Sequence, residues 1–336
     1  MSPDSALDVS TSGAERGSAS PRLSVVAPLF NEERIVPELV RRITESCRKL
    51  GEPFEILMID DGSRDGTLLE LAALSRGIPE LRVVSLFRNF GHMSALSAGI
   101  LLAKGGAVLV MDGDLQDPPE LIPQFYSEWQ GGADVVYGLR IARSERLAVR
   151  WATSLFYFTL GKLADTPIPK QAGTFCLMDR VVVDFLQAMP ERNRFFAGLR
   201  AWIGGKQSFV KYERPERPHG RSQVGMRGLF RLARTALISF SKVPLRYASL
   251  LSLFWGLVLF LVGSIAIGIR IFTNLAIPGW ATYTTLLGMT GFIQSLVLAA
   301  LSEYVAVIFD EVKNRPLFLV REEIVQGKSV HSSRRE

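Results

Sequence analysis

The sequence predicts an α/β fold with a mostly parallel sheet, followed by a basic amphipathic helix and two membrane-spanning helices. Three observations support this. From Leu23 to about Lys211, short apolar runs alternate with stretches of helical periodicity, which is typical of a sheet covered by helices on both faces. A basic segment of helical periodicity comes next. Two apolar segments then follow, each longer than the roughly 20 residues that a membrane-spanning helix needs.

The first part of the chain is expected to alternate strands and helices. Strands are expected at residues 23–28, 54–61, 81–87 and 107–114, and helices at residues 32–51, 65–76 and 92–105. The first and third helices end at a glycine, a common helix stop. Ligands of parallel sheets bind beyond the carboxyl ends of the strands. The turns "PLFNEE", "DDGSRD" and "DGDLQD" follow three of these strands, so we expect them to converge on one crevice.

The charge and cysteine content of the chain limit the kinds of partner and site that we expect. The 336-residue chain has a formal charge of +6, which favours anionic partners such as nucleotides, phospholipid surfaces or nucleic acid. Its two cysteines, Cys47 and Cys176, are too few for a disulfide framework or a zinc cluster. Residues 1–21 lack the apolar region of a secretory signal, so we expect a disordered tail there and a catalytic part on the cytosolic side.

The segment "AVLVMDGDLQDPPE" places acids directly after an apolar run. Strand side chains alternate, so Asp112, Asp114 and Gln116 are expected to point to one place as the strand ends. Hard oxygen ligands of this kind suit Mg²⁺ or Mn²⁺, with substrate phosphates completing the coordination. A cation would also remove the repulsion among these acids and Asp117. The alternative interpretation is a solvated acidic loop.

The C-terminal third is predicted to associate with a membrane. Residues 213–247 are expected to form a polar loop and then a helix with basic residues on one face, which suits a membrane interface, although a soluble surface helix is the alternative. Apolar spans are expected at residues 248–272 and 284–309. Basic residues flank both outer ends, so the positive-inside rule predicts a hairpin in region 248–309 with both chain ends, including the tail 310–336, in the cytosol. Glu303, inside the second span, is expected to pack between helices or subunits rather than to face lipid.

Several motifs in order resemble one family. They are "VVAPLFNEE", "EILMIDDGSRDGT", "RNFGHMSALSAG", "VMDGDLQDPPE", "VVYGLR" and "RPERPHGRS". The chain resembles family 2 glycosyltransferases of the GT-A (Rossmann-like) fold, and within them the polyprenyl-phosphate glycosyltransferases with two C-terminal transmembrane helices. The resemblance implies a GT-A catalytic domain at residues 22–212. It also implies an integral membrane protein, which would lie in the cell inner membrane if the source is bacterial.

The resemblance implies roles for the residues of the donor site. Four residues would bind the nucleoside of the donor: Pro28, Glu32, Asp60 and Asp61. Asp112 would contact the nucleotide and, with Asp114 and Gln116, hold Mg²⁺ or Mn²⁺ on its diphosphate. Asp112 and Asp114 are thus expected to be catalytic together with Arg140, which would neutralise charge that develops on the leaving phosphate. A solvated surface arginine is the alternative for Arg140.

The resemblance also implies an acceptor site and an overall reaction. Arg217, Arg221 and Ser222 would bind the phosphate of a polyprenyl (undecaprenyl) phosphate, with an ordinary basic loop near anionic lipid as the alternative. The expected reaction is inverting, metal-dependent transfer of a hexose to that lipid at the cytosolic membrane face. UDP-glucose is favoured as donor, with GDP-mannose and other UDP-sugars open. We expect membrane lipids as partners, a homo-oligomer and no nucleic acid.

The chain departs from the family pattern at one motif. Where the family often has "DxGDFRL", this sequence has Gln171, Thr174 and Cys176 in place of the two acids and the arginine. A lipid phosphate is already anionic near neutral pH, with a second pKa of about 6, so it needs orientation more than proton removal. We therefore expect activity to survive, with a membrane-anchored nucleotide-binding scaffold as the non-enzymatic alternative.

Overall fold

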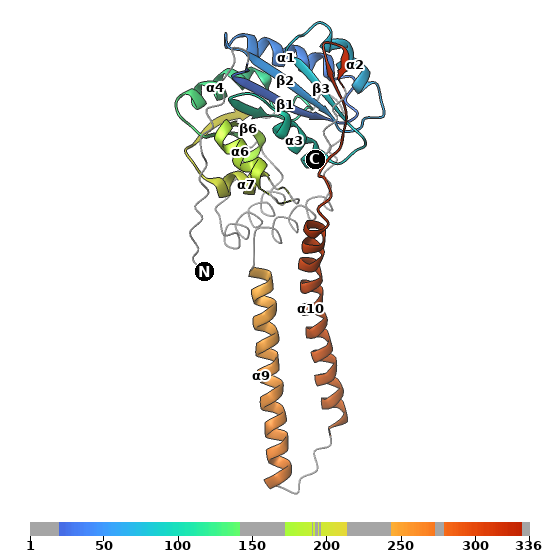
Figure 1. Ribbon diagram of the computed structural model, residues 1–336. Coiled ribbons are helices and arrows are strands. Elements are labelled where there is room, and N and C mark those ends of the chain that lie inside the picture. Colours follow the sequence, from blue (N-terminus) through green and yellow to red (C-terminus); the bar gives the residue numbers. More distant parts are fainter. Residues whose placement is uncertain are drawn as a thin grey trace, which may run out of the picture.

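The computed structural model describes residues 20–141, 172–189, 191, 194, 196–213, 243–272 and 279–330. These residues form an α/β domain and two long helices that extend from it side by side (Figure 1). Most of the expected N-terminal tail and the expected interfacial helix between residues 214 and 242 lie outside the described residues.

The described strands form one mixed nine-stranded sheet with the order β7-β5-β6-β4-β1-β2-β3-β8-β9. Strands β4, β1, β2 and β3 are parallel neighbours at its centre, as the alternating pattern predicts. Strand β6 pairs antiparallel with both β4 and β5, whereas β7 pairs parallel with β5. The strands are β1 (Leu23–Leu29), β2 (Phe54–Asp60), β3 (Leu81–Leu86), β4 (Ala107–Val110), β5 (Val135–Ile141), β6 (Ala172–Asp179), β7 (Gln207–Glu213), β8 (Val320–Val325) and β9 (Lys328–Val330).

Helices cover both faces of the sheet, because the central strands carry apolar side chains on both sides. One core cluster contains residues of α1 and α4, and the other contains residues of α3, α6 and α7. The three helices expected between the first strands are confirmed as α1, α2 and α3. The helices of the domain are α1 (Val36–Arg48), α2 (Thr67–Ser75), α3 (His92–Leu102), the 3₁₀ turn η1 (Pro119–Leu121), α4 (Ile122–Gln130), α6 (Arg180–Ala188) and α7 (Phe196–Ile203).

Two element boundaries differ from the sequence prediction. Helix α1 begins at Val36 rather than at residue 32, with a proline in its first turn, and residues 33–35 form a turn before it. Strand β4 ends at Val110 rather than at residue 114, because Gly113 and Asp114 form a turn. The acids of "DGDLQD" therefore lie on a turn, and strand alternation does not orient them.

The long helices are α9 (Val243–Phe272) and α10 (Trp280–Val312), which run in opposite directions and contact each other (Figure 1). Trp255 Nε1 lies 3.4 Å from Thr290 Oγ1 across this pair. Within the described residues, one helical segment, Thr285–Val312, is long and apolar enough to cross a membrane, and a shorter apolar stretch is found at Ala248–Leu259. The two-span hairpin remains a prediction, as does the packing of Glu303, which is half-buried on α10.

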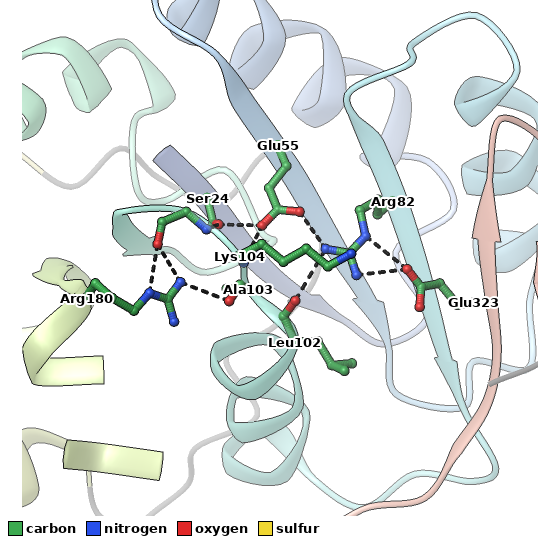
Figure 2. Close-up of polar contacts among 9 residues, drawn as sticks. Ser24, Glu55, Arg82, Leu102, Ala103, Lys104, Arg180 and Glu323 are labelled. Atoms are coloured by element: carbon green, nitrogen blue, oxygen red, sulfur yellow. Dashed lines mark hydrogen bonds and ion pairs between the residues drawn. The ribbon is translucent and has the colours of Figure 1, made fainter. Parts of the chain in front are cut away.

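The chain returns from α10 to the sheet through strands β8 and β9, which lie in the segment 310–336 predicted to be a tail. Strand β8 pairs antiparallel with β3 and places Glu323 beside Arg82, whose Nε lies 2.9 Å from Glu323 Oε1 (Figure 2). Arg82 also pairs with Glu55, which accepts hydrogen bonds from Ser24 Oγ and from the backbone N–H of Lys104. This network joins the strand that follows the long helices to the centre of the sheet.

The ion-pair network predicts that two variants of its residues lose different amounts of stability. The side chains of Glu55 and Arg82 are only 7% and 11% exposed, so Arg82→Ala leaves Glu55 buried without its cation and should cost about 3 kcal/mol. Glu323→Ala leaves the pair of Arg82 and Glu55 intact and should cost about 1 kcal/mol. Thermal unfolding of the purified protein in detergent measures both variants.

The matched control is Glu38→Ala, which removes a solvent-exposed pair with Arg41 on α1 and should change the unfolding temperature much less than Arg82→Ala does. Equal stability of the Arg82→Ala and Glu38→Ala variants would contradict this account of the network.

Candidate functional site

The turns after β1, β2 and β4 lie next to one another at the carboxyl edge of the sheet. Asn31, after β1, receives a hydrogen bond on its Oδ1 from the backbone N–H of Arg64 at 2.8 Å, and its own N–H donates to Ser63 Oγ at 3.0 Å. Gly113, after β4, packs against Pro28 and Leu29 at the end of β1. The three turns predicted to converge are therefore in contact.

Asp60, the last residue of β2, and Asp61, which follows it, are both buried and hold backbone groups in place. Asp60 accepts hydrogen bonds from Ser63 N–H and from the hydroxyl of Ser85, both at 3.1 Å. The carboxylate of Asp61 accepts from the backbone N–H groups of Phe90 at 2.8 Å and Gly91 at 2.9 Å, directly before α3. Burial raises the pKa of Asp61, and these two N–H groups partly offset the rise. Asp61 thus holds the loop that leads into α3.

The two other predicted nucleoside-binding residues flank this region. Pro28 is buried within β1, and the side chain of Glu32 is half-buried in the turn that follows. The backbone N–H of Glu32 donates to Thr67 Oγ1 at 2.9 Å, which ties this turn to the start of α2. Their binding of a nucleoside remains a prediction.

The acidic turn after β4 has a compact internal structure. Asp114 Oδ1 accepts a hydrogen bond from Gln116 N–H at 3.1 Å, and Leu115 between them has a φ of 60°. Asp117 Oδ2 accepts from Asp112 N–H at 3.0 Å and closes the turn. Asp112, Asp114 and Gln116 are half-buried and Asp117 is fully buried. The three predicted metal ligands therefore lie on one short turn.

Arg140, from β5, provides positive charge beside this turn. Its Nη2 lies 3.9 Å from Asp112 Oδ2 and also 3.9 Å from Asp117 Oδ1. Its Nε donates to the hydroxyl of Tyr212 at 3.2 Å. Arg140 is therefore no solvated surface arginine, and it lies beside Asp112, one of the two acids predicted to be catalytic with it.

Sequence reasoning missed Tyr212 and the structural role of Asp117. The Tyr212 hydroxyl donates to Asp117 Oδ1 at 2.7 Å. Burial, followed by the negative charge of Asp112, raises the pKa of Asp117 to about 6. One signal in the sequence could have identified Tyr212. The alternation of residues in β7 places it on the buried face, and a buried tyrosine hydroxyl usually needs a hydrogen-bond partner.

His92 lies at the start of α3, close to the same acids. Its Nε2 is 3.5 Å from Asp112 Oδ1, and its side chain is 44% exposed. The histidine is thus accessible at the rim of the acidic turn.

Strand β6 carries the departures from the family pattern. Cys176 is buried against the guanidinium of Arg200, a buried residue of α7 that also donates to the backbone oxygens of Gly173 at 2.9 Å and Thr174 at 3.4 Å. Burial raises the pKa of the Cys176 thiol. Gly173 also lies against the guanidinium of Arg140. Gln171 lies outside the described residues.

The donor set at the acidic turn fits a cation that shares its coordination with a substrate. Two carboxylates and one amide oxygen on a short turn suit Mg²⁺ or Mn²⁺ when phosphate oxygens complete the coordination. Among the described residues, no group of three or more His, Cys, Asp or Glu side chains is arranged to hold a metal by itself. The predicted phosphate-binding residues Arg217, Arg221 and Ser222 lie outside the described part of the chain.

The chain is similar to known glycosyltransferases over most of its length. The model of the family "Glycosyl transferase family 2" matches residues 24–186. The SfII prophage-derived bactoprenol glucosyl transferase of Shigella flexneri is 36% identical over 302 residues, which cover 89% of this chain and 97% of that protein. The uncharacterized glycosyltransferase YkcC of Bacillus subtilis (strain 168) is 36% identical over 299 residues, which cover 89% of this chain and 93% of that protein.

One solved structure illustrates the more distant similarities. It is glucosyl-3-phosphoglycerate synthase from Mycobacterium tuberculosis in complex with uridine diphosphate. Its sequence is 20% identical to this chain, the alignment covers 65% of this chain and 79% of the synthase, and the TM-score is 0.44.

The packing of Gly113 predicts the effect of enlarging this residue. An added Cβ would lie 2.4 Å from Leu29 Cδ2 and 2.7 Å from the backbone oxygen of Pro28, so Gly113→Ala must displace the acidic turn. We expect a loss of about 1–3 kcal/mol, as for other overpacked sites. Gly77→Ala is the control, because its Cβ meets no atom closer than 3.9 Å. Thermal unfolding compares the two, and equal midpoints would refute the tight packing of the turn.

Proposed function

Because this chain belongs to glycosyl transferase family 2 and is a glycosyltransferase, we propose that it transfers a hexose from a nucleotide-diphosphate sugar to a polyprenyl phosphate. The observation that carries the proposal is the match to a bactoprenol glucosyl transferase over 89% of this chain, which extends beyond the catalytic domain into the C-terminal helices. The name of that relative favours glucose as the sugar, and UDP-glucose is the donor that we propose.

The acidic turn is proposed to receive the diphosphate of the donor. Asp112, Asp114 and Gln116 would hold Mg²⁺ or Mn²⁺, which neutralises charge on the diphosphate when bound. Asp117 and the turn geometry support this assignment, because they fix the backbone that carries these oxygens.

Arg140 is proposed to stabilise the leaving diphosphate. Its guanidinium lies beside Asp112 and Asp117 but makes no short contact with either carboxylate, at 3.9 Å from both. Among the described residues its one hydrogen bond runs from Nε to Tyr212, and we propose that its Nη groups face a phosphate oxygen, where positive charge favours departure of the leaving group. The nucleoside would lie against Pro28, Glu32, Asp60 and Asp61, whose oxygens can accept hydrogen bonds from base and ribose.

The acceptor phosphate is proposed to attack without a protein base. One of its anionic oxygens forms a bond to the anomeric carbon while the bond from that carbon to the diphosphate oxygen breaks on the opposite side. An α-linked donor then gives a β-linked lipid-phosphate sugar. Arg217, Arg221 and Ser222 would orient the acceptor phosphate, since arginine binds phosphate through two parallel hydrogen bonds.

The C-terminal helices are proposed to place this reaction at a membrane. Segment Thr285–Val312 and the paired helix α9 would form the two-span hairpin, with the catalytic domain and both chain ends in the cytosol. Their exposed apolar side chains, such as Leu253 and Leu287, suit lipid or another copy of the chain. A homo-oligomer would cover part of this surface.

A transfer assay tests the proposal directly. The full-length protein in detergent is incubated with undecaprenyl phosphate, Mg²⁺ or Mn²⁺, and in turn UDP-glucose, GDP-mannose and UDP-linked amino sugars, and the lipid product is identified by mass. We expect a hexosyl-phosphoryl lipid with UDP-glucose. Formation of product with none of the donors would overturn the proposed function and favour a nucleotide-binding scaffold.

The metal assignment predicts a large effect of one substitution. Asp114→Ala removes one of the two carboxylates that would hold the cation, so transfer should fall by about 100-fold or more while membrane extraction and yield stay unchanged. Asp184→Ala, on the exposed face of α6, is the control and should transfer normally. Wild-type turnover in the Asp114→Ala variant would exclude this residue as a metal ligand.

The acceptor assignment predicts a change in one Michaelis constant. Arg217→Ala should raise the KM for undecaprenyl phosphate about tenfold or more, because charge-assisted hydrogen bonds to its phosphate are lost, and leave the KM for the nucleotide sugar nearly unchanged. Lys211→Ala, an exposed basic residue of β7, is the control. The reverse pattern, with the donor KM raised instead, would move Arg217 to the donor site.

A further inference from the structure

A buried carboxylate connects three elements behind the acidic turn. Asp117 is fully buried, and its two oxygens have different partners. Oδ2 accepts a hydrogen bond from the backbone N–H of Asp112, within the turn that follows β4. Oδ1 accepts from the hydroxyl of Tyr212 on β7 and lies 3.9 Å from Nη2 of Arg140 on β5. The Asp117 side chain thus connects the turn after β4 with strands β5 and β7.

Tyr212 provides the direct link to Arg140. Strands β5 and β7 pair in parallel with Arg140 opposite Tyr212, so the two side chains are neighbours on one face. The Tyr212 hydroxyl accepts a hydrogen bond from Arg140 Nε at 3.2 Å and donates one to Asp117 Oδ1 at 2.7 Å. Its ring packs edge-on against Phe175, with centroids 5.5 Å apart, which fixes the position of the hydroxyl.

We propose that Asp117 and Tyr212 are positioning residues that hold the acidic turn and Arg140 at a fixed separation. This inference rests on the proposed function, in which the turn holds the cation and Arg140 contacts the leaving diphosphate. The Tyr212 hydroxyl accepts a hydrogen bond from the guanidinium of Arg140, and Asp117 accepts one from the backbone of the turn. Arg140 is thereby kept 3.9 Å from Asp112 instead of closing to hydrogen-bond distance on it.

Loss of the hydroxyl should collapse this arrangement. In Tyr212→Phe the ring and its packing remain, but Arg140 Nε loses its acceptor and Asp117 loses a donor. Arg140 is then expected to pair directly with Asp112 and Asp117, since charged groups this close attract when water is largely excluded. That pairing competes with the cation for Asp112 and turns the guanidinium away from the diphosphate.

The first test measures metal binding, independently of turnover. Full-length variants in detergent are titrated with Mn²⁺ in the presence of UDP, and free Mn²⁺ is followed by its electron paramagnetic resonance signal. Tyr212→Phe and Asp117→Asn should each weaken Mn²⁺ binding about 10- to 100-fold, the usual effect of removing a partner that orients a ligand. Tyr137→Phe is the control, because it removes a buried hydroxyl from β5 that has no hydrogen-bond partner among the described residues.

The second test asks whether Tyr212 acts through Arg140. Turnover is measured for Tyr212→Phe, Arg140→Ala and the double variant. We expect Tyr212→Phe to lower kcat about tenfold in the wild-type background and by less than about threefold in the Arg140→Ala background, because coupled residues are not additive. The KM for the lipid acceptor should be unchanged.

Two results would overturn the inference while leaving the proposed function intact. One is Mn²⁺ affinity in both Tyr212→Phe and Asp117→Asn equal to that of the wild type, and the other is a full tenfold loss of kcat that persists without Arg140. If the wild-type protein itself transfers no sugar with any donor, the proposed function fails instead. The two failures are therefore distinguishable.

Discussion

The carboxyl edge of the sheet depends on the balance of negative charge in the acidic turn. Asp112, Asp114 and Asp117 follow one another over a few residues, and Asp117 is completely buried. Like charges in a partly dehydrated site repel strongly, so the turn needs positive or hydrogen-bonding partners. The described residues supply Arg140 and the Tyr212 hydroxyl. In the proposed function, a divalent cation shared with the diphosphate of the donor would complete the balance.

The central strands place the site, and the two outer parts of the sheet connect the domain to the long helices. The parallel strands β4, β1 and β2 bring their turns together at one edge, and Gly113 lets the acidic turn pack tightly on β1. Strand β7, at one side of the sheet, precedes the segment that leads to α9. Helix α10 leads to β8, which lies beside β3 near the other side of the sheet. The pair of long helices is therefore connected to both sides of the domain. The network of Arg82, Glu55 and Glu323 secures the second connection (Figure 2).

Elements that depend on neighbouring residues in the sequence could be predicted, whereas contacts between distant parts of the chain could not. The first four strands, the three helices between them and the converging turns follow from apolar runs and turn residues, as does the apolar segment of α10. The roles of Tyr212 and Asp117 were missed because they are 95 residues apart and meet only through the pairing of β7 with β5. Strand β8 was missed for a similar reason: "VREEIV" is too polar to indicate a strand by itself, and its partner β3 lies far away in the sequence. Strand β4 was predicted too long because the alternation of polar residues continues through Gly113 into the turn.

The central claim is that Asp112, Asp114 and Gln116 bind a divalent cation together with the diphosphate of the donor. The most direct measurement is a crystallographic or cryo-electron-microscopic structure of the full-length protein with Mn²⁺ and UDP, with the ion identified by its anomalous scattering in the crystal. The account predicts one Mn²⁺ ion in contact with oxygens of this turn and of the diphosphate, with Arg140 beside the phosphates. Bound UDP without an ion at the turn, and with the acids directed into solvent, would contradict it.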